Sequence, residues 1–263
     1  MILRSEPVFS PRPWGNRKLN EIYAVDSIEP IGEVWLLSDI AGMRTPLKRD
    51  VEVHYPEEYN EVFCGSKAPR FPLLVKYIST TDWLSVQVHP DDETARMLEG
   101  EPWGKSECWY FTSNGKIAAG FKEKRLPEVI GPDTLNYFEL EPGDFVGLPA
   151  GLVHALGPNS SLIEVQQASD ITYRTYDWGR GRELHVEKAR KAIKPELSPK
   201  IVRNMNERIE QGFFSITPAE SVEGTGLAIV IEERPELFVV IDDSFSRQKP
   251  FLWITVEMGN LYV

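Results

Sequence analysis

Short apolar runs of about four to eight residues follow one another through most of the chain, each bounded by glycine, proline or aspartate. Examples are WLSVQVHP, SECWYF and SLIEVQQ. The runs are rich in β-branched and aromatic residues, and several alternate apolar with polar side chains, which is the period of a half-buried strand. This pattern is typical of an antiparallel sandwich or barrel, so we predict a mainly β fold with a few helices.

Helical patterns occur at three places, residues 55–63, 91–100 and 184–193. Pro195 cannot continue the last of these helices, and a polar connector follows it. A second strand-rich stretch then runs to Val263. We therefore predict one β-domain over residues 1–200, with an N-terminal extension and a helical insert, and an incomplete second β-domain over residues 201–263.

The charge of the chain limits its partners. Of 263 residues, 41% are apolar, which is enough for a sizeable core. The 29 Lys and Arg against 40 Asp and Glu give a net charge of −11. Because so acidic a chain repels a phosphate backbone, we do not expect nucleic acid as a main partner.

The first residues lack the apolar segment of a secretory signal, and no stretch approaches the roughly 18 apolar residues that span a bilayer. We expect a cytoplasmic protein without a membrane partner. The two cysteines, Cys64 and Cys108, are too few for a disulfide framework or a thiolate zinc cluster. A bound metal would therefore need nitrogen and oxygen ligands.

The first polar motif lies in the run from Leu84 to Pro90. Side chains two apart on a strand share a face, so Gln87 and His89 point to the same side. A single histidine inside a small barrel is more often a hydrogen-bonded core residue than a metal ligand. The second motif, Lys105 to Tyr110, places Lys105, Glu107 and Trp109 on one face, which alone would indicate a surface salt bridge.

The third motif is the most specific. Gly143 is followed after five residues by Pro149, then by Gly151 and His154, a spacing that resembles the second signature of the cupin barrel. The glycines suit tight turns, and His154 would begin a strand with its ring directed into the barrel. We therefore expect a cupin, or jelly-roll, barrel followed by a second, incomplete cupin-like β-domain.

The three motifs together would place two nitrogen and two oxygen ligands inside one barrel: Gln87, His89, Glu107 and His154. Such a set suits a divalent metal with an open position, and zinc, one ion per chain, is our first expectation. Two histidines and one carboxylate can also hold Fe(II) and activate oxygen, so a cupin oxygenase stays open as an alternative.

The same segments resemble the type I phosphomannose isomerases, in the short form of bacteria and archaea. The resemblance covers roughly residues 10–200 in consistent order. It is carried by six segments, PRPWG (11–15), GEVW (32–35), QVHPDD (87–92), KSECWY (105–110), PAGLVHAL (149–156) and ASDITYRTYDWGRGRELHVEKA (168–189).

The resemblance implies a zinc-dependent interconversion of mannose 6-phosphate and fructose 6-phosphate through an enediol. It identifies the zinc ligands as the four residues named above. It also places further active-site residues on Lys76, Lys105, Asp170 and Arg174, and an active-site aromatic on Trp14.

We expect the catalytic residues to be Arg174 for charge stabilisation, Asp170 for ring opening and Lys105, with the proton-transfer base left open. Lys76 and Trp14 are expected to bind the substrate, a hexose 6-phosphate. A catalytically weak protein that only binds sugar phosphates is a further alternative. The sequence also leaves open the oligomeric state and what completes the carboxyl-terminal domain.

Overall fold

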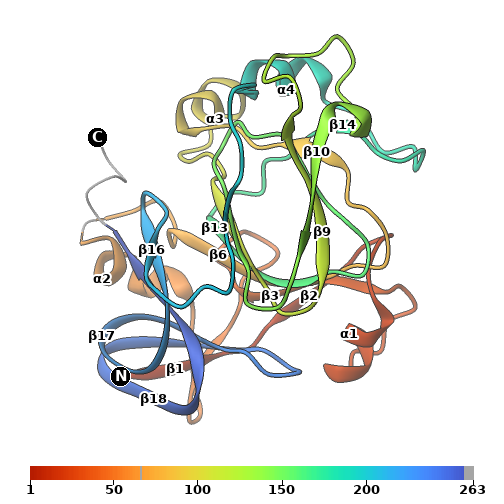
Figure 1. Cartoon of the computed structure of the whole chain (residues 1–263). Coiled ribbons are helices and arrows are strands. Elements are labelled where there is room, and N and C mark those ends of the chain that lie inside the picture. The colour runs from red at the N-terminus through yellow and green to blue at the C-terminus, as the bar shows by residue number, and fades with distance from the viewer. Residues whose placement is uncertain (66, 258–263) are drawn as a thin grey trace.

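The computed structural model describes residues 1–65 and 67–257, so the strand expected to run to Val263 ends outside the described part. The fold is mainly β, with few helices, as predicted, and its strands form three sheets (Figure 1). The central sheet contains, in spatial order, β15 (Lys200–Val202), β11 (Phe145–Leu148), β8 (Glu107–Phe111), β13 (Ser161–Gln167), β6 (Leu73–Ser79), β3 (Ile31–Leu37) and β2 (Val8–Pro11).

A five-stranded sheet covers one face of the central sheet. Its order is β10 (Leu135–Leu140), β9 (Gly115–Phe121), β12 (His154–Leu156), β7 (Val86–Val88) and β14 (Tyr173–Tyr176). Side chains from both sheets, among them Trp109, Phe111, Ile117 and Leu156, form one apolar cluster between them. These two sheets form the barrel that the third motif predicted.

The third sheet joins distant parts of the chain. Its order is β16 (Ile209–Glu210), β17 (Phe214–Val230), β18 (Glu236–Val256), β1 (Ile2–Ser5), β4 (Leu47–Arg49) and β5 (Glu52–His54). The two long strands curl, so that residues 227–230 pair with both 236–239 and 251–254. Figure 1 shows β1 beside β18, so this sheet contains residues from both sides of the boundary expected near residue 200. The division of the chain into two domains there remains a prediction.

The central sheet is buried on both faces. On β8, Trp109 and Phe111 pack in the barrel, whereas Cys108 packs in the cluster on the opposite face, with Val239 and Leu252 of the third sheet. The alternation of the β8 sequence therefore separates two cores. All seven residues of β6 are buried, which explains its continuous apolar run around Lys76.

The three predicted helical segments are confirmed. They form η1 (Pro56–Tyr59) with α2 (Asn60–Cys64), then α3 (Asp92–Glu99) and α4 (Val186–Ala192). The sequence pattern missed two short elements, α1 (Arg17–Ile22) and η2 (Pro132–Thr134), which are too short to show a helical period. Asn16 caps α1 by accepting a hydrogen bond from the backbone of Lys18. No helix in the described chain is long and apolar enough to cross a membrane.

Candidate metal centre and substrate cavity

Strand pairing brings the predicted residues of the five-stranded sheet together. Gln87 on β7 pairs with His154 on β12 on one side and with Arg174 on β14 on the other. His89 follows directly after β7 and lies on the same side as Gln87, as the strand period predicted. Glu107 comes from β8 of the opposite sheet. The site is therefore assembled between the two sheets of the barrel.

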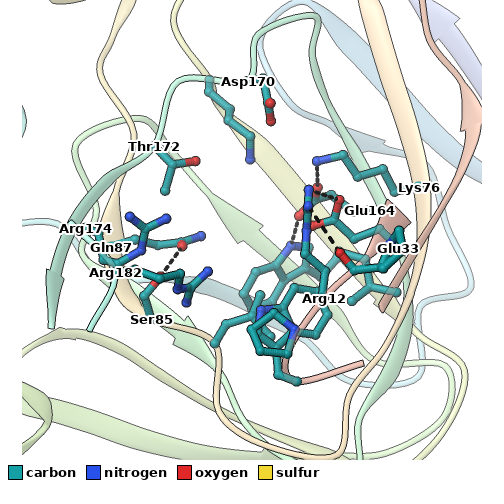
Figure 2. Close-up of a pocket in the computed structure, with 17 residues that line it drawn as sticks. Arg12, Glu33, Lys76, Ser85, Gln87, Glu164, Asp170, Thr172, Arg174 and Arg182 are labelled. Carbon is teal, nitrogen blue, oxygen red and sulfur yellow. Dashed lines mark hydrogen bonds and ion pairs between the residues drawn. The ribbon is translucent and has the colours of Figure 1, made fainter. Parts of the chain in front are cut away.

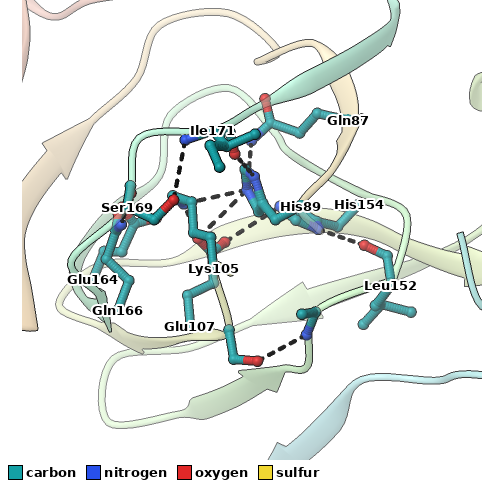
Figure 3. A network of polar contacts seen from close by, with 12 residues as sticks. Gln87, His89, Lys105, Glu107, Leu152, His154, Glu164, Gln166, Ser169 and Ile171 are labelled. Carbon is teal, nitrogen blue, oxygen red and sulfur yellow. Dashed lines mark hydrogen bonds and ion pairs between the residues drawn. The ribbon is translucent and has the colours of Figure 1, made fainter. Parts of the chain in front are cut away.

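His89, Glu107 and His154 form a compact buried group. Their potential ligand atoms all lie within 4.8 Å of one another, and each residue is at most 2% exposed. His154 Nε2 is 3.3 Å from Glu107 Oε1, and His89 Nε2 is 3.6 Å from Glu107 Oε2 (Figure 3). Three of the four predicted ligands therefore meet in one place.

The other ring nitrogen of each histidine is fixed by the backbone. His89 Nδ1 lies 2.8 Å from the carbonyl oxygen of Ile171, and His154 Nδ1 lies 2.9 Å from that of Leu152. A ring nitrogen can bond to a carbonyl oxygen only as an N–H donor. Each Nδ1 therefore carries the proton, and each Nε2 presents a lone pair to the centre, as in histidines that bind metals.

Two atoms of this group are buried without a hydrogen-bond partner, Glu107 Oε1 and His154 Nε2. They face each other as two acceptors, an arrangement that a positive ion between them would satisfy. Burial, and then the positive charge of Lys105, lower the pKa of His89 well below its usual value. Burial alone would raise the pKa of Glu107, but Lys105, His89 and His154 together outweigh it, and the pKa lies well below its usual range. A neutral imidazole and a charged carboxylate are the forms that bind divalent metals.

Gln87, the fourth predicted ligand, lies next to the group. Its Nε2 is 3.5 Å from His89 Nε2, and its Oε1 accepts a hydrogen bond of 3.0 Å from Ser85. A half-turn of the amide would present the oxygen to the centre instead. Lys105 is also buried here, with Nζ 3.2 Å from His89 Nε2 and in an ion pair with Glu107.

A turn in the third motif links the segments that carry His89 and His154. Gly151 has a φ of +93°, which favours glycine, and a Cβ there would meet Lys194 at 2.8 Å. Its N–H donates to the carbonyl oxygen of His89 at 2.8 Å, so the turn before His154 is tied to the residue after β7. The glycine of the motif therefore connects the segments of His89 and His154 through the backbone.

A cavity of about 420 Å³ opens beside this group. The predicted residues Trp14, Lys76, Gln87, Lys105, Asp170 and Arg174 all line it. Figure 2 shows Arg174 and Arg182 on one side of the cavity and Arg12, Glu33, Lys76 and Glu164 on the other. Lys105 lines the cavity and also contacts His89 and Glu107. The cavity therefore adjoins the group of candidate metal ligands.

One wall of the cavity consists of ion pairs. Lys76 Nζ lies 3.2 Å from Glu164 Oε1, and Arg12 Nη2 lies 2.9 Å from Glu33 Oε2. Burial would lower the pKa of Lys76, but Glu164 and Glu33 raise it above its usual value. Burial would raise the pKa of Glu33, but Lys76 and Arg12 lower it to about 2. Lys76 and Glu33 are therefore both charged at neutral pH.

Three residues of this wall were not predicted from the sequence: Arg12, Glu33 and Glu164. Two of them lie inside segments that carried the family resemblance, PRPWG and GEVW. Glu164 lies on β13, two residues before Gln166, so the two polar side chains share one face of a buried strand. A charged residue within an otherwise buried strand was the available signal.

The opposite wall carries arginines around one carboxylate. Asp177 accepts hydrogen bonds from Arg182 Nε at 2.8 Å and Nη2 at 2.5 Å, and Arg180 Nη2 lies 3.0 Å from it. Among the described residues, the side chain of Arg174 donates only to the carbonyl oxygen of Glu183, at 2.9 Å, and its buried Nε has no partner. Within residues 1–65 and 67–257, Arg174 forms no ion pair. This wall therefore presents a positive charge that its own carboxylates do not neutralise.

Comparison with known proteins agrees with this geometry. A family model described as phosphomannose isomerase type I, catalytic domain, matches residues 3–129. The mannose-6-phosphate isomerase ManA of Bacillus subtilis is 32% identical, with 97% of this chain and 85% of the relative covered. The probable mannose-6-phosphate isomerase GmuF of the same organism is 36% identical over 72% of this chain and 67% of the relative.

Solved structures show the same fold. The crystal structure of the mannose 6-phosphate isomerase from Bacillus subtilis is 25% identical and superposes with a TM-score of 0.69, covering 97% of both chains. A putative mannosephosphate isomerase from Archaeoglobus fulgidus gives a TM-score of 0.74 at 21% identity, again over 97% of both chains. With a relative at 32% identity over most of both chains, these findings show that the chain belongs to the type I phosphomannose isomerase family.

Proposed function

We propose that the chain interconverts mannose 6-phosphate and fructose 6-phosphate through an enediol, using one zinc ion per chain. One observation carries the proposal: the buried acceptor atoms of Glu107 and His154 face each other next to a cavity lined by cations. Family membership supports the reaction, and the donor set supports a metal.

The residues that would hold zinc are His89, Glu107, His154 and Gln87. Two imidazole nitrogens and carboxylate or amide oxygens suit this ion. When bound, zinc would stabilise negative charge on the sugar oxygens O1 and O2. The second histidine nitrogens are already held by backbone carbonyls, so the ligands need little reorganisation.

The phosphate group would lie against the arginine wall. A phosphate monoester carries between one and two negative charges and binds best to guanidinium groups. Arg174 has no ion pair within the described residues, and Arg182 shares Asp177 with Arg180. On the other wall each cation already has its own carboxylate. We therefore assign the phosphate to Arg174 and Arg182.

Proton transfer requires a group next to C1 and C2 of the open-chain sugar. Lys105 contacts two of the metal-binding residues, His89 and Glu107, so its amine lies beside the reacting carbons in this proposal. The lysine would carry the proton from C2 to C1. Asp170 lines the cavity, has no hydrogen-bond partner among the described residues and would assist ring opening.

Two further predicted residues would shape the binding of the sugar. Trp14 is 2% exposed and lines the cavity, where its ring offers an apolar surface to the C–H groups of the substrate. Lys76 would hold a sugar oxygen from its position between Glu164 and the ring of Trp35, 4.8 Å from the ring centre.

The test is a coupled isomerase assay on protein stripped with a chelator and then reloaded. We expect no turnover of mannose 6-phosphate without metal and recovery with one equivalent of zinc. An inert zinc-loaded protein would contradict the proposal. Oxygen consumption with iron and no isomerisation would identify an oxygenase, and substrate binding without turnover would identify a sugar-phosphate-binding protein.

A further inference from the structure

The wall formed by β2, β3, β6 and β13 carries two carboxylates, each held by an indole and a cation. Glu164 accepts from Trp109 Nε1 at 2.8 Å through Oε2 and pairs with Lys76 through Oε1. Glu33 accepts from Trp35 Nε1 at 2.8 Å and from Arg12. The two carboxylates have matching surroundings and differ in how many of their oxygens are used.

Both oxygens of Glu164 have partners, whereas Glu33 uses only one. Arg12 and Trp35 both donate to Glu33 Oε2, and no described residue bonds to Oε1. The side chain of Glu33 is 10% exposed, and the residue lines the cavity. Arg12 is 32% exposed there, and its Nε has no partner among the described residues. One acceptor and one donor of the same ion pair therefore remain available at the cavity.

A carboxylate oxygen beside a guanidinium N–H suits two neighbouring sugar hydroxyls, one of which donates while the other accepts. Hydrogen bonds to charged groups are stronger than neutral ones. Because Arg12 and Glu33 neutralise each other, this pair does not compete with Arg174 for the phosphate. The wall is therefore suited to the uncharged part of the sugar.

We propose that Glu33 and Arg12 form a subsite for the C3 and C4 hydroxyls of the substrate and determine specificity among hexose 6-phosphates. The inference rests on the proposed function, which places C1 and C2 near Lys105 and the phosphate near Arg174. The hydroxyls between these two ends then meet the remaining polar wall. Glu164, with both oxygens in use, is a positioning residue for Lys76.

The experiment is a thermodynamic cycle on the zinc-loaded chain, in which a substitution in the protein is combined with removal of one hydroxyl from the ligand. Calorimetry would give dissociation constants for mannitol 6-phosphate, which cannot isomerise, and for its 3-deoxy and 4-deoxy derivatives. We expect Glu33→Gln to weaken binding of mannitol 6-phosphate by about 10- to 100-fold. In the unchanged protein, removal of the hydroxyl that bonds to Glu33 should weaken binding by a similar factor. For one deoxy derivative, the same substitution should then cost less than about twofold.

Two further variants keep the experiment decisive. Arg12→Lys changes a more exposed residue, keeps the charge and removes the guanidinium donors, and it should show the same loss of coupling on a deoxy derivative. Glu139→Gln, at an exposed position of β10 outside the cavity, is the matched control and should leave all three constants unchanged.

The subsite would be overturned if the substitution weakened binding of both deoxy derivatives by the same factor as binding of mannitol 6-phosphate. The substitution and the removal of a hydroxyl would then act independently. Full affinity of both the Glu33 and the Arg12 variants for mannitol 6-phosphate would also overturn it. Failure of the proposed function has a different signature, because the unchanged zinc-loaded protein would then not isomerise mannose 6-phosphate.

Discussion

At the scale of single residues, the most demanding feature is the pair of buried acceptors, Glu107 Oε1 and His154 Nε2. They lie 3.3 Å apart and neither has a hydrogen-bond partner. Leaving a buried polar atom unsatisfied costs on the order of 1–3 kcal/mol. In the proposed function, a metal ion between the two atoms would satisfy both and remove this cost.

Substitutions at Glu107 and Arg174 should separate metal binding from catalysis. Glu107→Gln removes a charged ligand, so we expect loss of zinc and of turnover by at least about 100-fold. Arg174→Ala leaves the ligands in place but removes a proposed phosphate contact, so zinc should stay bound while turnover falls by a similar factor. Metal analysis and the isomerase assay measure the two effects. Full activity in both variants would show that the site is wrongly assigned.

Glu33 should make stability depend on pH in the acid range. Its pKa falls from an ordinary 4.5 to about 2 in the folded chain, because Lys76 and Arg12 outweigh the effect of burial. The stabilisation, about 3 kcal/mol, is present above pH 4.5 and is lost as the pH falls towards 2. Urea unfolding of Glu33→Gln should therefore show a large deficit at pH 7 and a smaller one at pH 3. An equal deficit at both values would refute this, and Glu139→Gln should match the unchanged chain within about 0.5 kcal/mol.

At the scale of elements, α3 begins at Asp92, shortly after β7, and its N-cap residue Asp91 anchors the start of the helix. Asp91 caps the helix by accepting from the backbone of Thr94 at 2.9 Å, and its carboxylate pairs with Lys194 at 2.7 Å. Burial would raise the pKa of Asp91, but these contacts lower it to about 2. The cap lies two residues after His89, so the start of the helix is close in sequence to the candidate metal centre.

Removing the cap should destabilise the chain by about 1–2 kcal/mol in Asp91→Ala, whereas Asp91→Asn should retain most of the cap. The folded pKa lies below the usual 3.8, so this contribution is present above pH 4 and disappears as the pH falls towards 2. Urea unfolding at pH 7 and pH 3 measures it. Equal stability of the two variants at pH 7 would contradict a capping role.

The elements also show which sequence signals were sufficient. Strand alternation separated Trp109 from Cys108 correctly, because two different cores lie on the two faces of β8. It also placed Gln87 with His89. The same signal could not show that Gln87 pairs with both His154 and Arg174, because strand partners are chosen by long-range packing.

At the scale of the whole molecule, the central sheet is shared by two cores. Its outer face packs on Leu227, Val239 and Leu252 of the third sheet, and β1 connects the amino terminus to β18. The acidic span 220–243 carries seven acidic residues and Arg234, a net of −6 of the total −11, and none of it lines the cavity. The excess negative charge therefore lies apart from the proposed anion site.

Because the sheets share a core, we expect the chain to unfold in one transition. Leu252→Ala, at a position 1% exposed, should cost about 2–5 kcal/mol and lower the midpoint for activity and for secondary structure together. Val129→Ala, at a position 75% exposed, is the control and should change little. Two separate transitions, with activity surviving the first, would instead support two independent domains divided near residue 200.

The sequence by itself predicted the mainly β fold and the candidate metal-binding residues His89, Glu107 and His154, because strand period and motif spacing are local. Its resemblance to a known family pointed to the cavity residues Lys76 and Arg174. Only the tertiary structure decided that Glu33 and Arg12 form a second polar wall, and that the amino-terminal β1 joins the sheet of β17 and β18. These features depend on which strands become neighbours, which is decided by burial of apolar faces across the whole chain and cannot be obtained from short segments.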